Sequence, residues 1–393
     1  MKISILCHDL SANSIVRTYP IAKVLQRNYE VEVIGIPFAG EVFAPYKREF
    51  DYKTIRLTTE GGKLSFSKTE RFPGFLRAMK QLANLIEGDA IYAFKPLLPS
   101  FGVGLMAKYL KGIPLVLDIE DWDAEAFVHS NVRTKLTSLK LPGILYPKNE
   151  WQGFLLEHAV GLADQITVVS DFLKKKFGGI KLPHGADTRL FDPRRYDRAR
   201  IREKWRLEEA KIVLFAGTAH AHKGVEDLVV ALKAIRSPSA RLMIVGKRTP
   251  YQQELVRHGN GRIISIGPRP HSEMPQILSV ADLIVLPQRN TPYAQAQVPG
   301  KVFEAMAMAK PIIATRVSDL PEILDGCGWI IQPENPSSLA KAIQHALNNP
   351  QESCEKGQKA RQRCIAQYSW DSMEQTLTSI FERIKPRSRP LPS

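Results

Sequence analysis

Short apolar runs rich in β-branched residues alternate with segments of helical periodicity along almost the whole chain of 393 residues. Most of the runs are continuous and bounded by Gly, Pro or acidic residues, which is typical of parallel strands covered on both faces. The predicted strands are residues 3–7, 31–37, 54–57, 90–94, 115–118 and 165–170, and then 211–217, 241–246, 263–267, 282–287, 311–315 and 328–331. The pattern predicts an α/β protein with two doubly wound, Rossmann-like domains.

The restart of the pattern at Lys211 sets the expected domain boundaries. We expect a first domain over residues 1–195 and a second over 196–370. Residues 371–385 have apolar positions at helical spacing and are expected to form a helix that crosses back to the first domain. Residues 386–393 are expected to be a flexible basic tail. Because open α/β sheets bind ligands beyond the carboxyl ends of their strands, we expect a ligand in a central cleft that the two domains face.

Charge and cysteine content exclude several classes of function. The formal charge of +15 is spread over both halves of the chain, and no short DNA- or RNA-recognition motif is present, so a nucleic-acid partner is not expected. The four cysteines form no Cys-x-x-Cys pair, so neither a metal site nor a disulfide framework is indicated. The apolar run 3–7 is too short for a signal peptide, and no stretch approaches the roughly 18 apolar residues that span a bilayer. We therefore expect a cytoplasmic protein.

Residues 298–315 read as a loop, a short Ala-rich helix and a strand. Pro299 and Gly300 place a tight turn before the helix, so that its first backbone N–H groups, including that of Val302, are expected to be free to hold a phosphate. Glu304 lies in the first turn, where its carboxylate can accept two hydrogen bonds from a ribose diol. The alternative is a solvated Glu stabilised by the helix dipole.

Residues 215–228 repeat the order of strand, loop and helix. Gly217 permits close backbone approach at the end of the strand. Lys223 brings a positive charge to the start of the next helix, where it suits a pyrophosphate, although an isolated lysine is more often a surface residue. His220 and His222 have no third ligand nearby in the sequence, so hydrogen-bonding or exposed roles are favoured over a metal site.

The order of these motifs resembles a known family. The motifs are Gly217, Lys223-Gly224, residues 242–246 ending in Gly246, residues 281–287, Pro299-x-Lys301-x-x-Glu304 and Lys310-Pro311. Together they are similar to the nucleotide-sugar-binding domain of retaining glycosyltransferases of family 4, which have the GT-B fold. The segment from His184 to Pro193 is similar to the family's interdomain segment, with His184 where Asn usually stands.

The resemblance implies retaining transfer of a sugar from a nucleoside-diphosphate sugar to an acceptor hydroxyl, in polysaccharide or glycolipid biosynthesis. It implies catalytic roles for Lys223 on the diphosphate and Glu304 on the ribose, with neither a metal nor a resident cofactor. The acceptor would be a carbohydrate, a lipid-linked glycan or a small molecule. The implied donor-binding residues are Gly217, Thr218, Lys223, Gly246, Gln297, Pro299, Gly300, Lys301, Val302 and Glu304.

Two positions depart from the family pattern. Ala296 stands where a first Glu precedes Glu304 by eight residues, so its contact to the donor sugar is missing or is made by Gln295 or Gln297. Thr218 stands where the family has an Arg, and Lys301 is expected to supply the second positive charge. These departures leave open a non-catalytic GT-B-like protein that binds a nucleotide sugar or a partner. A GT-B epimerase or phosphorylase is disfavoured, because it leaves the motif around Glu304 without its role.

The acceptor is expected on the first domain. His8, Asp9, Ser11 and Asn13 follow the first strand and are the candidate acceptor-binding residues. For Ser11 and Asn13, as for Ser14, the alternative role is to cap the following helix. Glu120 and Asp121 follow the strand at 115–118 and are candidates for orienting the acceptor hydroxyl or for acid–base catalysis, with helix capping as the alternative.

Two further segments combine apolar and basic residues, 71–86 and 133–146. They suggest peripheral contact with the anionic inner face of a membrane, which would suit a lipid-linked acceptor. The alternative is that their apolar stripes pack onto the protein's own sheet.

Overall fold

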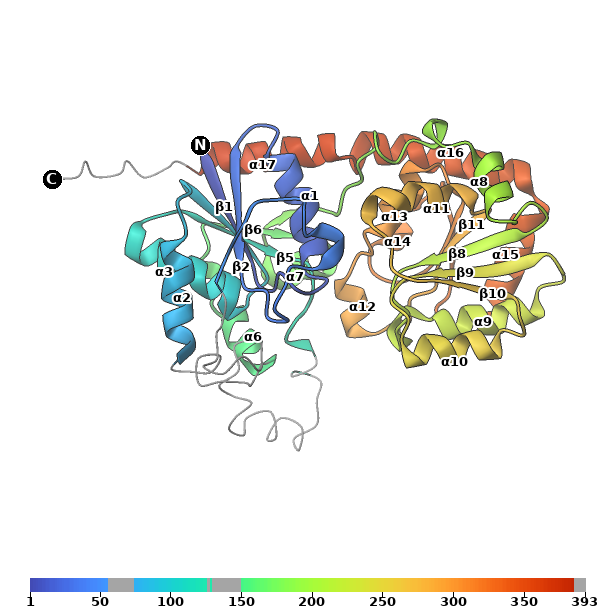
Figure 1. Ribbon diagram of the computed structural model, residues 1–393, viewed down its shortest axis with the longest axis horizontal. Helices are drawn as coiled ribbons and strands as arrows, with labels where there is room; N and C mark the ends of the chain where they lie inside the picture. Colours follow the sequence, from blue (N-terminus) through green and yellow to red (C-terminus); the bar gives the residue numbers. More distant parts are fainter. Residues whose placement is uncertain (56–73, 126–127, 129–149, 385–393) are drawn as a thin grey trace. The chain divides into compact units, whose positions relative to one another are not determined.

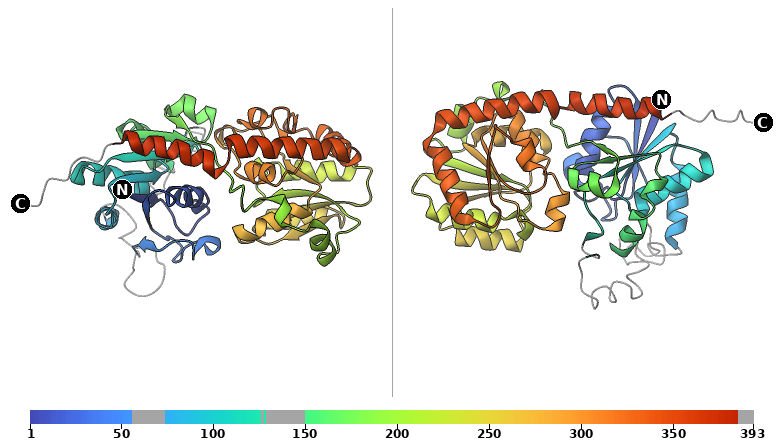
Figure 2. Two further views of the ribbon diagram at one scale, coloured as in Figure 1. Left: turned by 90° about the horizontal axis from the view of Figure 1, so that it is seen from above. Right: turned by 180° about the vertical axis from the view of Figure 1, so that it is seen from behind.

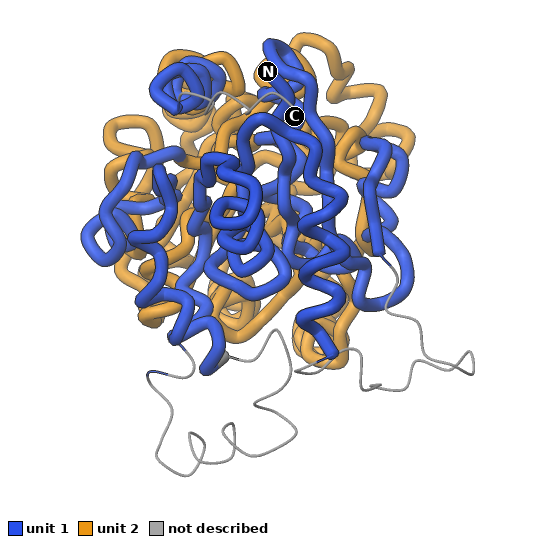
Figure 3. Tube along the Cα trace, turned by 90° about the vertical axis from the view of Figure 1, so that its left-hand side faces the viewer, with its two compact units in different colours: residues 1–182, 373–393 blue, residues 183–372 orange. Residues whose placement is uncertain are grey.

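The computed structural model describes residues 1–55, 74–125, 128 and 150–384 of the chain. These residues form two compact units, coloured separately in Figure 3. Unit 1 comprises residues 1–182 and 373–393, and unit 2 comprises residues 183–372. Both are α/β, and each has a parallel sheet, which confirms the predicted fold class (Figure 1).

The sheet of unit 1 has the strand order β3-β2-β1-β4-β5-β6-β7, and every neighbouring pair is parallel. Its strands are β1 (Lys2–Cys7), β2 (Glu30–Gly35), β3 (Tyr52–Thr54), β4 (Ala90–Phe94), β5 (Leu115–Ile119), β6 (Gln165–Val168) and β7 (Ile180–Lys181). Its helices are α1 (Ile15–Leu25), α2 (Gly74–Asn84), α3 (Val103–Lys111), α6 (Glu150–Glu157), α7 (Asp171–Phe177) and most of α17 (Trp370–Arg383), with a π-helix, η2, at Leu98–Gly102. The strand order reverses between β1 and β4, so the carboxyl ends of these two strands form the switch point of unit 1.

The sheet of unit 2 has the order β10-β9-β8-β11-β12-β13, again all parallel. Its strands are β8 (Lys211–Ala216), β9 (Ala240–Val245), β10 (Ile263–Ile266), β11 (Leu283–Leu286), β12 (Ile312–Thr315) and β13 (Trp329–Ile331). Its helices are α8 (Arg198–Lys204), α9 (Val225–Ala234), α10 (Pro250–His258), α11 (Met274–Val280), α12 (Pro292–Ala296), α13 (Lys301–Ala307), α14 (Leu320–Ile323), α15 (Pro336–Asn348) and α16 (Pro350–Gln367). The switch point of unit 2 lies between β8 and β11.

Successive residues of β8 point to opposite cores, as a doubly wound sheet requires. Leu214 is fully buried in a core shared with α11, α13 and α16, whereas Val213 is fully buried in a core shared with α9, α10 and α15. Figure 2 shows helices on both faces of the sheet. The continuous apolar runs of the sequence therefore reflect strands that are buried on both sides.

Residues 183–195, expected with the first domain, lie in unit 2. Ala186 forms a parallel bridge with Ser369, and Phe191 is fully buried in the core beneath α13 and α16. The helix expected at 371–385 is α17, whose residues from Met373 onward belong to unit 1, where Phe381 packs against Tyr29 with 5.7 Å between ring centroids. The tail at 386–393 lies outside the described residues.

The apolar stripe of α2 packs inward, which is the alternative to membrane contact that the sequence left open for residues 71–86. Phe75, Met79 and Leu82 are buried, whereas Arg77 and Lys80 are exposed. The segment at 133–146 lies outside the described residues. Within the described ranges, no helix has both the length and the apolar character needed to cross a bilayer.

Candidate functional site

Two glycines bring the carboxyl ends of β8 and β9 close together in unit 2. A Cβ atom on Gly246 would lie 2.5 Å from the carbonyl carbon of Gly217, so any larger residue would push the two loops apart. Gly217 itself has φ +133°, a conformation that favours glycine. Because neither glycine has a side chain, the loops after β8 and β9 can lie close together next to the switch point.

Lys301, the first residue of α13, reaches this edge. A Cβ atom on Gly217 would lie 2.2 Å from Lys301 Nζ, so the absence of a side chain at Gly217 makes room for the ammonium group. The same Nζ lies 4.9 Å from the centre of the Phe215 ring. Burial and then the positive charge of Lys223 lower the pKa of Lys301 to about 7, while Glu304 acts in the opposite direction.

Lys223 ends the short 3-10 helix η6 (Ala221–Lys223) and donates a hydrogen bond from Nζ to the carbonyl of Thr218, at 3.1 Å. The turn that carries Lys223 is fixed behind it by Gly224, where a Cβ atom would clash with the carbonyl oxygen of Pro287. The pKa of His220 is lowered by burial and then by the charges of Lys223 and Lys301. Two lysines are therefore held near each other at the end of β8.

The expectation that the first N–H groups of α13 are free is wrong for two of them. Val302 N–H donates to the carbonyl of Pro299 at 3.0 Å, and Phe303 N–H donates to that of Gly300 at 3.1 Å. The helix begins with a tight turn whose hydrogen bonds satisfy these donors, and the side chain of Val302 is fully buried. His184 packs against Gly300, where a Cβ atom would lie 3.4 Å from the ring. The backbone N–H groups of Val302 and Phe303 are therefore not available to an anion.

Glu304 lies on α13 with a partner that the sequence did not reveal. His271 Nε2 lies 3.0 Å from Glu304 Oε1, and each side chain is about one-fifth exposed. The His271 ring packs against Phe191, with 5.2 Å between centroids. The solvated Glu of the alternative interpretation is thus not what the structure contains.

The residues proposed to replace the missing first Glu have different environments. Gln295 is used within unit 2, where its Oε1 accepts from Ser318 N–H at 2.8 Å and its Nε2 donates to Asn290 at 2.7 Å. Ala296 is fully buried, and Gln297 is partly exposed in the loop after α12. Gln295 is therefore engaged on both atoms of its amide within unit 2.

The two loop histidines pack as aromatic rings. His220 and His222 stack with 5.6 Å between centroids, and the ring of His222 meets Tyr293 edge-on at 5.4 Å. The backbone N–H of Arg289 donates to the carbonyl of His222, and the Arg289 side chain pairs with Asp227. These contacts fix the loop that carries Lys223.

In unit 1, Lys95 directly follows β4 at the switch point. Its Nζ forms ion pairs with Asp121 and, at 2.9 Å, with Asp123. Burial alone would lower the pKa of Lys95, but Asp121, Asp123 and Glu120 together raise it well above its usual value. Lys95 has φ +67°, an unfavourable conformation for a side-chain-bearing residue. The ion pairs position Asp121, which the sequence singled out as a catalytic candidate.

Glu120 lies beside this group at the end of β5. Burial and then the neighbouring charge of Asp121 raise its pKa well above the usual range, despite the opposing effects of Lys95 and Arg17. Burial and a neighbouring like charge both favour the protonated form of a carboxyl group. A role for Glu120 in acid–base catalysis stays a prediction.

The loop after β1 is organised around Asp9. Ser11 N–H and Ser11 Oγ both donate to Asp9 Oδ1, at 2.9 and 2.6 Å, while Ser14 Oγ donates to the Asp9 carbonyl. Ser14 precedes α1 without a side-chain capping bond, so the capping alternative is wrong for it. His8 and Asp9 are buried, whereas Asn13 is exposed.

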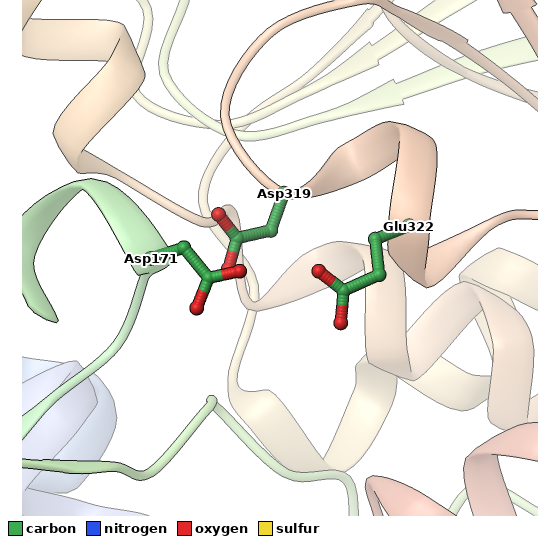
Figure 4. A group of neighbouring side chains, drawn as sticks. All are labelled: Asp171, Asp319 and Glu322. Atoms are coloured by element: carbon green, nitrogen blue, oxygen red, sulfur yellow. The ribbon is translucent and has the colours of Figure 1, made fainter. Parts of the chain in front are cut away.

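Figure 4 shows the carboxylates Asp171, Asp319 and Glu322. Asp171 belongs to unit 1, where it forms an ion pair with Lys181 at 3.0 Å. Asp319 and Glu322 belong to unit 2, at the start of α14. The two carboxylates of unit 2 alone are too few to define a metal site.

Sequence reasoning missed His271 and Lys95. Open α/β sheets bind ligands with the loops that follow their strands, and this rule led to Lys223 and Glu120. It applies equally to His271 and Lys95, because both follow the carboxyl end of a strand. The side chains that pair with them could not be identified from the sequence, because Glu304 lies 33 positions after His271 and Asp121 lies 26 positions after Lys95.

Comparisons with known proteins find a family match within unit 2 and relatives that are glycosyltransferases. Residues 210–349 match the family described as Glycosyl transferases group 1. An alpha-D-kanosaminyltransferase from Streptomyces kanamyceticus is 27% identical over 195 residues, 48% of this chain and 49% of the relative. A GDP-mannose-dependent alpha-(1-6)-phosphatidylinositol monomannoside mannosyltransferase from Mycobacterium tuberculosis (strain ATCC 25618 / H37Rv) is 30% identical over 238 residues, 56% of this chain and 61% of the relative. The matches thus span about half to three fifths of these curated relatives.

Solved structures match over almost the whole chain. The Anabaena protein HepE in complex with UDP-glucose has a TM-score of 0.72 at 18% identity, covering 98% of this chain and 100% of its own. Sucrose-phosphate synthase from Thermosynechococcus elongatus has a TM-score of 0.70 at 19% identity, covering 98% of both chains. At this level of identity the likeness concerns the fold. Residues 210–349 thus match the glycosyl transferases of group 1, and the two units have the GT-B fold of these solved structures.

Proposed function

We propose that the protein is a retaining glycosyltransferase that transfers a sugar from a nucleoside-diphosphate sugar to an acceptor hydroxyl. The observation that carries the proposal is the pair of lysines, Lys223 and Lys301, held near each other at the carboxyl end of β8. The charge of Lys223 disfavours the charged form of Lys301, and an anion bound near both ammonium groups would relieve this repulsion. The switch point is also where open α/β sheets bind nucleotides.

The lysines fit the chemistry of a departing diphosphate. In the proposed reaction the bond between the anomeric carbon and the diphosphate oxygen breaks, and the acceptor oxygen bonds to the same face of that carbon. The acceptor proton passes to the leaving diphosphate oxygen. Negative charge develops on the diphosphate as the bond breaks, so Lys223 and Lys301 would stabilise the transition state more than the ground state. No resident metal or organic cofactor enters this scheme.

Glu304 is the proposed ligand of the ribose diol, with Gly217, Thr218, Gly246 and Gln297 lining the same edge. The nucleotide is supported by the relatives: the mannosyltransferase is named GDP-mannose-dependent, and the Anabaena protein was solved with UDP-glucose. The thermal-shift panel described below is designed to identify the base and the sugar of the donor.

Unit 1 is the proposed acceptor-binding unit, for a carbohydrate or lipid-linked acceptor in polysaccharide or glycolipid biosynthesis. Because Lys95 pairs with Asp121, Glu120 is the stronger candidate for contact with the acceptor hydroxyl. His8 and Asp9 follow β1, which pairs with β4, and they are the further proposed acceptor-binding residues of this unit.

A second candidate function is a non-catalytic protein that binds a nucleotide sugar. The observation that favours it is the fully buried Ala296, at the position where the family has a sugar-contacting Glu. Release of free sugar from a bound nucleotide sugar, or its transfer, separates the two functions, because a binding protein would leave the donor intact.

The first experiment is a thermal-shift panel of UDP, GDP, ADP and dTDP and their sugars on wild type, Lys223→Ala and Glu304→Ala. A ligand at a hundredfold its dissociation constant adds roughly 2.7 kcal/mol to the free energy of unfolding. We expect one nucleotide to stabilise the wild type and to give a much smaller shift with either variant. Lys341→Ala, at an exposed lysine of unit 2, is the control and should match the wild type. A panel in which no nucleotide shifts the wild type would refute the proposed donor site.

The proposal includes peripheral contact of unit 1 with an anionic membrane surface. On α3, Tyr109 and Leu110 are 66% and 75% exposed, and α2 presents Leu76, Arg77 and Lys80 to solvent. Each Lys or Arg near such a surface contributes about 1 kcal/mol. We expect co-sedimentation with anionic liposomes at low salt, and its loss at high salt or in Leu110→Glu. Equal sedimentation with neutral liposomes would contradict an electrostatic contact.

A further inference from the structure

We propose that His271 is a positioning residue, which orients the Glu304 carboxylate toward the ribose diol. The inference rests on the proposed function, because it assigns His271 a role in the same nucleotide site. His271 begins the 3-10 helix η7 (His271–Glu273), whereas Glu304 lies on α13, so their contact joins two separate elements of unit 2. The distance from His271 Nε2 to Glu304 Oε1 is 3.0 Å, which is that of a hydrogen bond.

The contact defines which atom carries the proton. A carboxylate accepts hydrogen bonds and a ring nitrogen must donate to it, so the bond requires a proton on Nε2. Because Oε1 accepts from His271, Oε2 is the oxygen that we assign to the ribose diol. A carboxylate has enough acceptor capacity for His271 and for a ribose hydroxyl at the same time.

The imidazole is itself held by the core of unit 2. Its ring lies 5.2 Å from the ring of Phe191, which is fully buried. The pair remains partly accessible to solvent, since the side chains of His271 and Glu304 are 19% and 21% exposed. A Glu side chain that is ordered before the ligand arrives loses less conformational entropy on binding. This pre-ordering is the proposed contribution of His271.

The experiment compares ribonucleotides with their 2′-deoxy counterparts. The probes are UDP, GDP, 2′-deoxy-UDP and 2′-deoxy-GDP, and dissociation constants are measured by calorimetry on wild type and on His271→Ala, His271→Asn and His271→Gln. We expect His271→Ala to weaken the wild type's preferred ribonucleotide about tenfold. The 2′-deoxy counterpart should weaken by less than about threefold, because it lacks one of the hydroxyls through which the effect acts.

The other two variants test the position of the donor. The amide nitrogen of Gln reaches nearly as far as Nε2 of His, whereas that of Asn corresponds to Nδ1. We therefore expect His271→Gln to restore most of the affinity and His271→Asn to resemble His271→Ala. Thermal unfolding without ligand accompanies each variant, and His271→Gln provides a test even where His271→Ala folds poorly.

The outcomes distinguish this inference from the proposed function. Equal weakening of the ribonucleotide and its 2′-deoxy counterpart in His271→Ala would show a structural role and overturn the positioning role, while the donor site stands. Unchanged affinity in His271→Ala would overturn it as well. If the wild type binds none of the probes, the proposed function itself fails, and the inference fails with it.

Discussion

Replacement of Lys301 by Met is expected to lower the turnover of a nucleoside-diphosphate sugar by roughly 10²–10³-fold. The side chain lies in the space left by Gly217, and its ammonium group would face the diphosphate together with that of Lys223. The substitution should leave folding intact, because burial and the charge of Lys223 disfavour the charged form of Lys301 in the free protein. The measurement is a turnover assay with the donor found in the nucleotide panel, accompanied by thermal unfolding of each variant.

The same lysine should make donor binding depend on pH. Its pKa of about 7 in the free protein should rise when a diphosphate binds, because the anion favours the charged form. Above pH 7 binding therefore takes up a proton, and affinity falls by up to about tenfold per pH unit until the pKa of the bound state is reached. Below about pH 6 Lys301 is already charged, so its contribution to affinity is flat. Calorimetry in two buffers with different ionisation enthalpies measures the proton uptake directly.

Matched variants isolate this effect from the groups around it. Lys301→Arg keeps the charge at all these pH values and should remove most of the pH dependence while retaining affinity. Lys223, His220 and Glu304 also face Lys301, so His220→Gln identifies any contribution from the imidazole. Lys341→Met should behave like the wild type. A pH profile that persists unchanged in Lys301→Met would show that another group is responsible.

Substitution of Asp118 by Ala is expected to lower the free energy of unfolding of unit 1 by about 3–5 kcal/mol. Asp118 and Arg17 are both fully buried, with 2.9 Å between Arg17 Nη2 and Asp118 Oδ2. Tyr92 and Thr167 also donate to Asp118 Oδ2, at 2.9 and 2.7 Å. Removal of the carboxylate leaves the Arg17 guanidinium buried without its counter-charge. A loss of this size is a large part of the roughly 5–15 kcal/mol that stabilises a typical domain.

Hydrogen exchange resolved by peptide is the suitable measurement, because two units need not unfold together. Protection should fall in the peptides of unit 1 and stay unchanged in those of unit 2. Glu41→Ala removes the exposed ion pair with Lys47 and should cost less than about 1 kcal/mol. The double variant Arg17→Met/Asp118→Ala should lose less than the sum of the single variants, since it leaves no unpaired charge. A cost below about 1 kcal/mol for Asp118→Ala would mean that water or rearrangement solvates Arg17.

The fold could be predicted from the sequence because its signal is local. A parallel strand buried on both faces is a continuous apolar run, and β8 has such a run over almost its whole length. The two edge strands of unit 1, β3 and β7, lack this signal. β3 occupies Tyr52–Thr54 where 54–57 was expected, and the two-residue β7 was not predicted at all. Their pairing depends on the neighbouring strand rather than on their own composition.

Some residues of the candidate site could likewise be predicted from the sequence, whereas others could not. Gly217, Lys223 and Glu304 follow strands or begin helices, and such positions can be found from spacing alone. The N–H groups of Val302 and Phe303 could not be judged, because their hydrogen bonds depend on whether the first turn of α13 is tight. His271 required knowledge of which side chains meet across two elements, and that follows only from the packing of the sheet.

The chain path of unit 1 has a consequence for the order in which the protein folds during synthesis. Its core is completed by Leu377, Ile380 and Phe381 of α17, which are at most 2% exposed and follow unit 2 in the chain. Unit 2 is continuous, and its two ends are tied by backbone hydrogen bonds between Ala186 and residues 368 and 370. Synthesis of unit 1 therefore begins before that of unit 2, but unit 1 can complete its core only after unit 2 has been synthesised. Until α17 emerges, the surface that will receive it is exposed, and a nascent chain paused after unit 2 would be the form most in need of a chaperone.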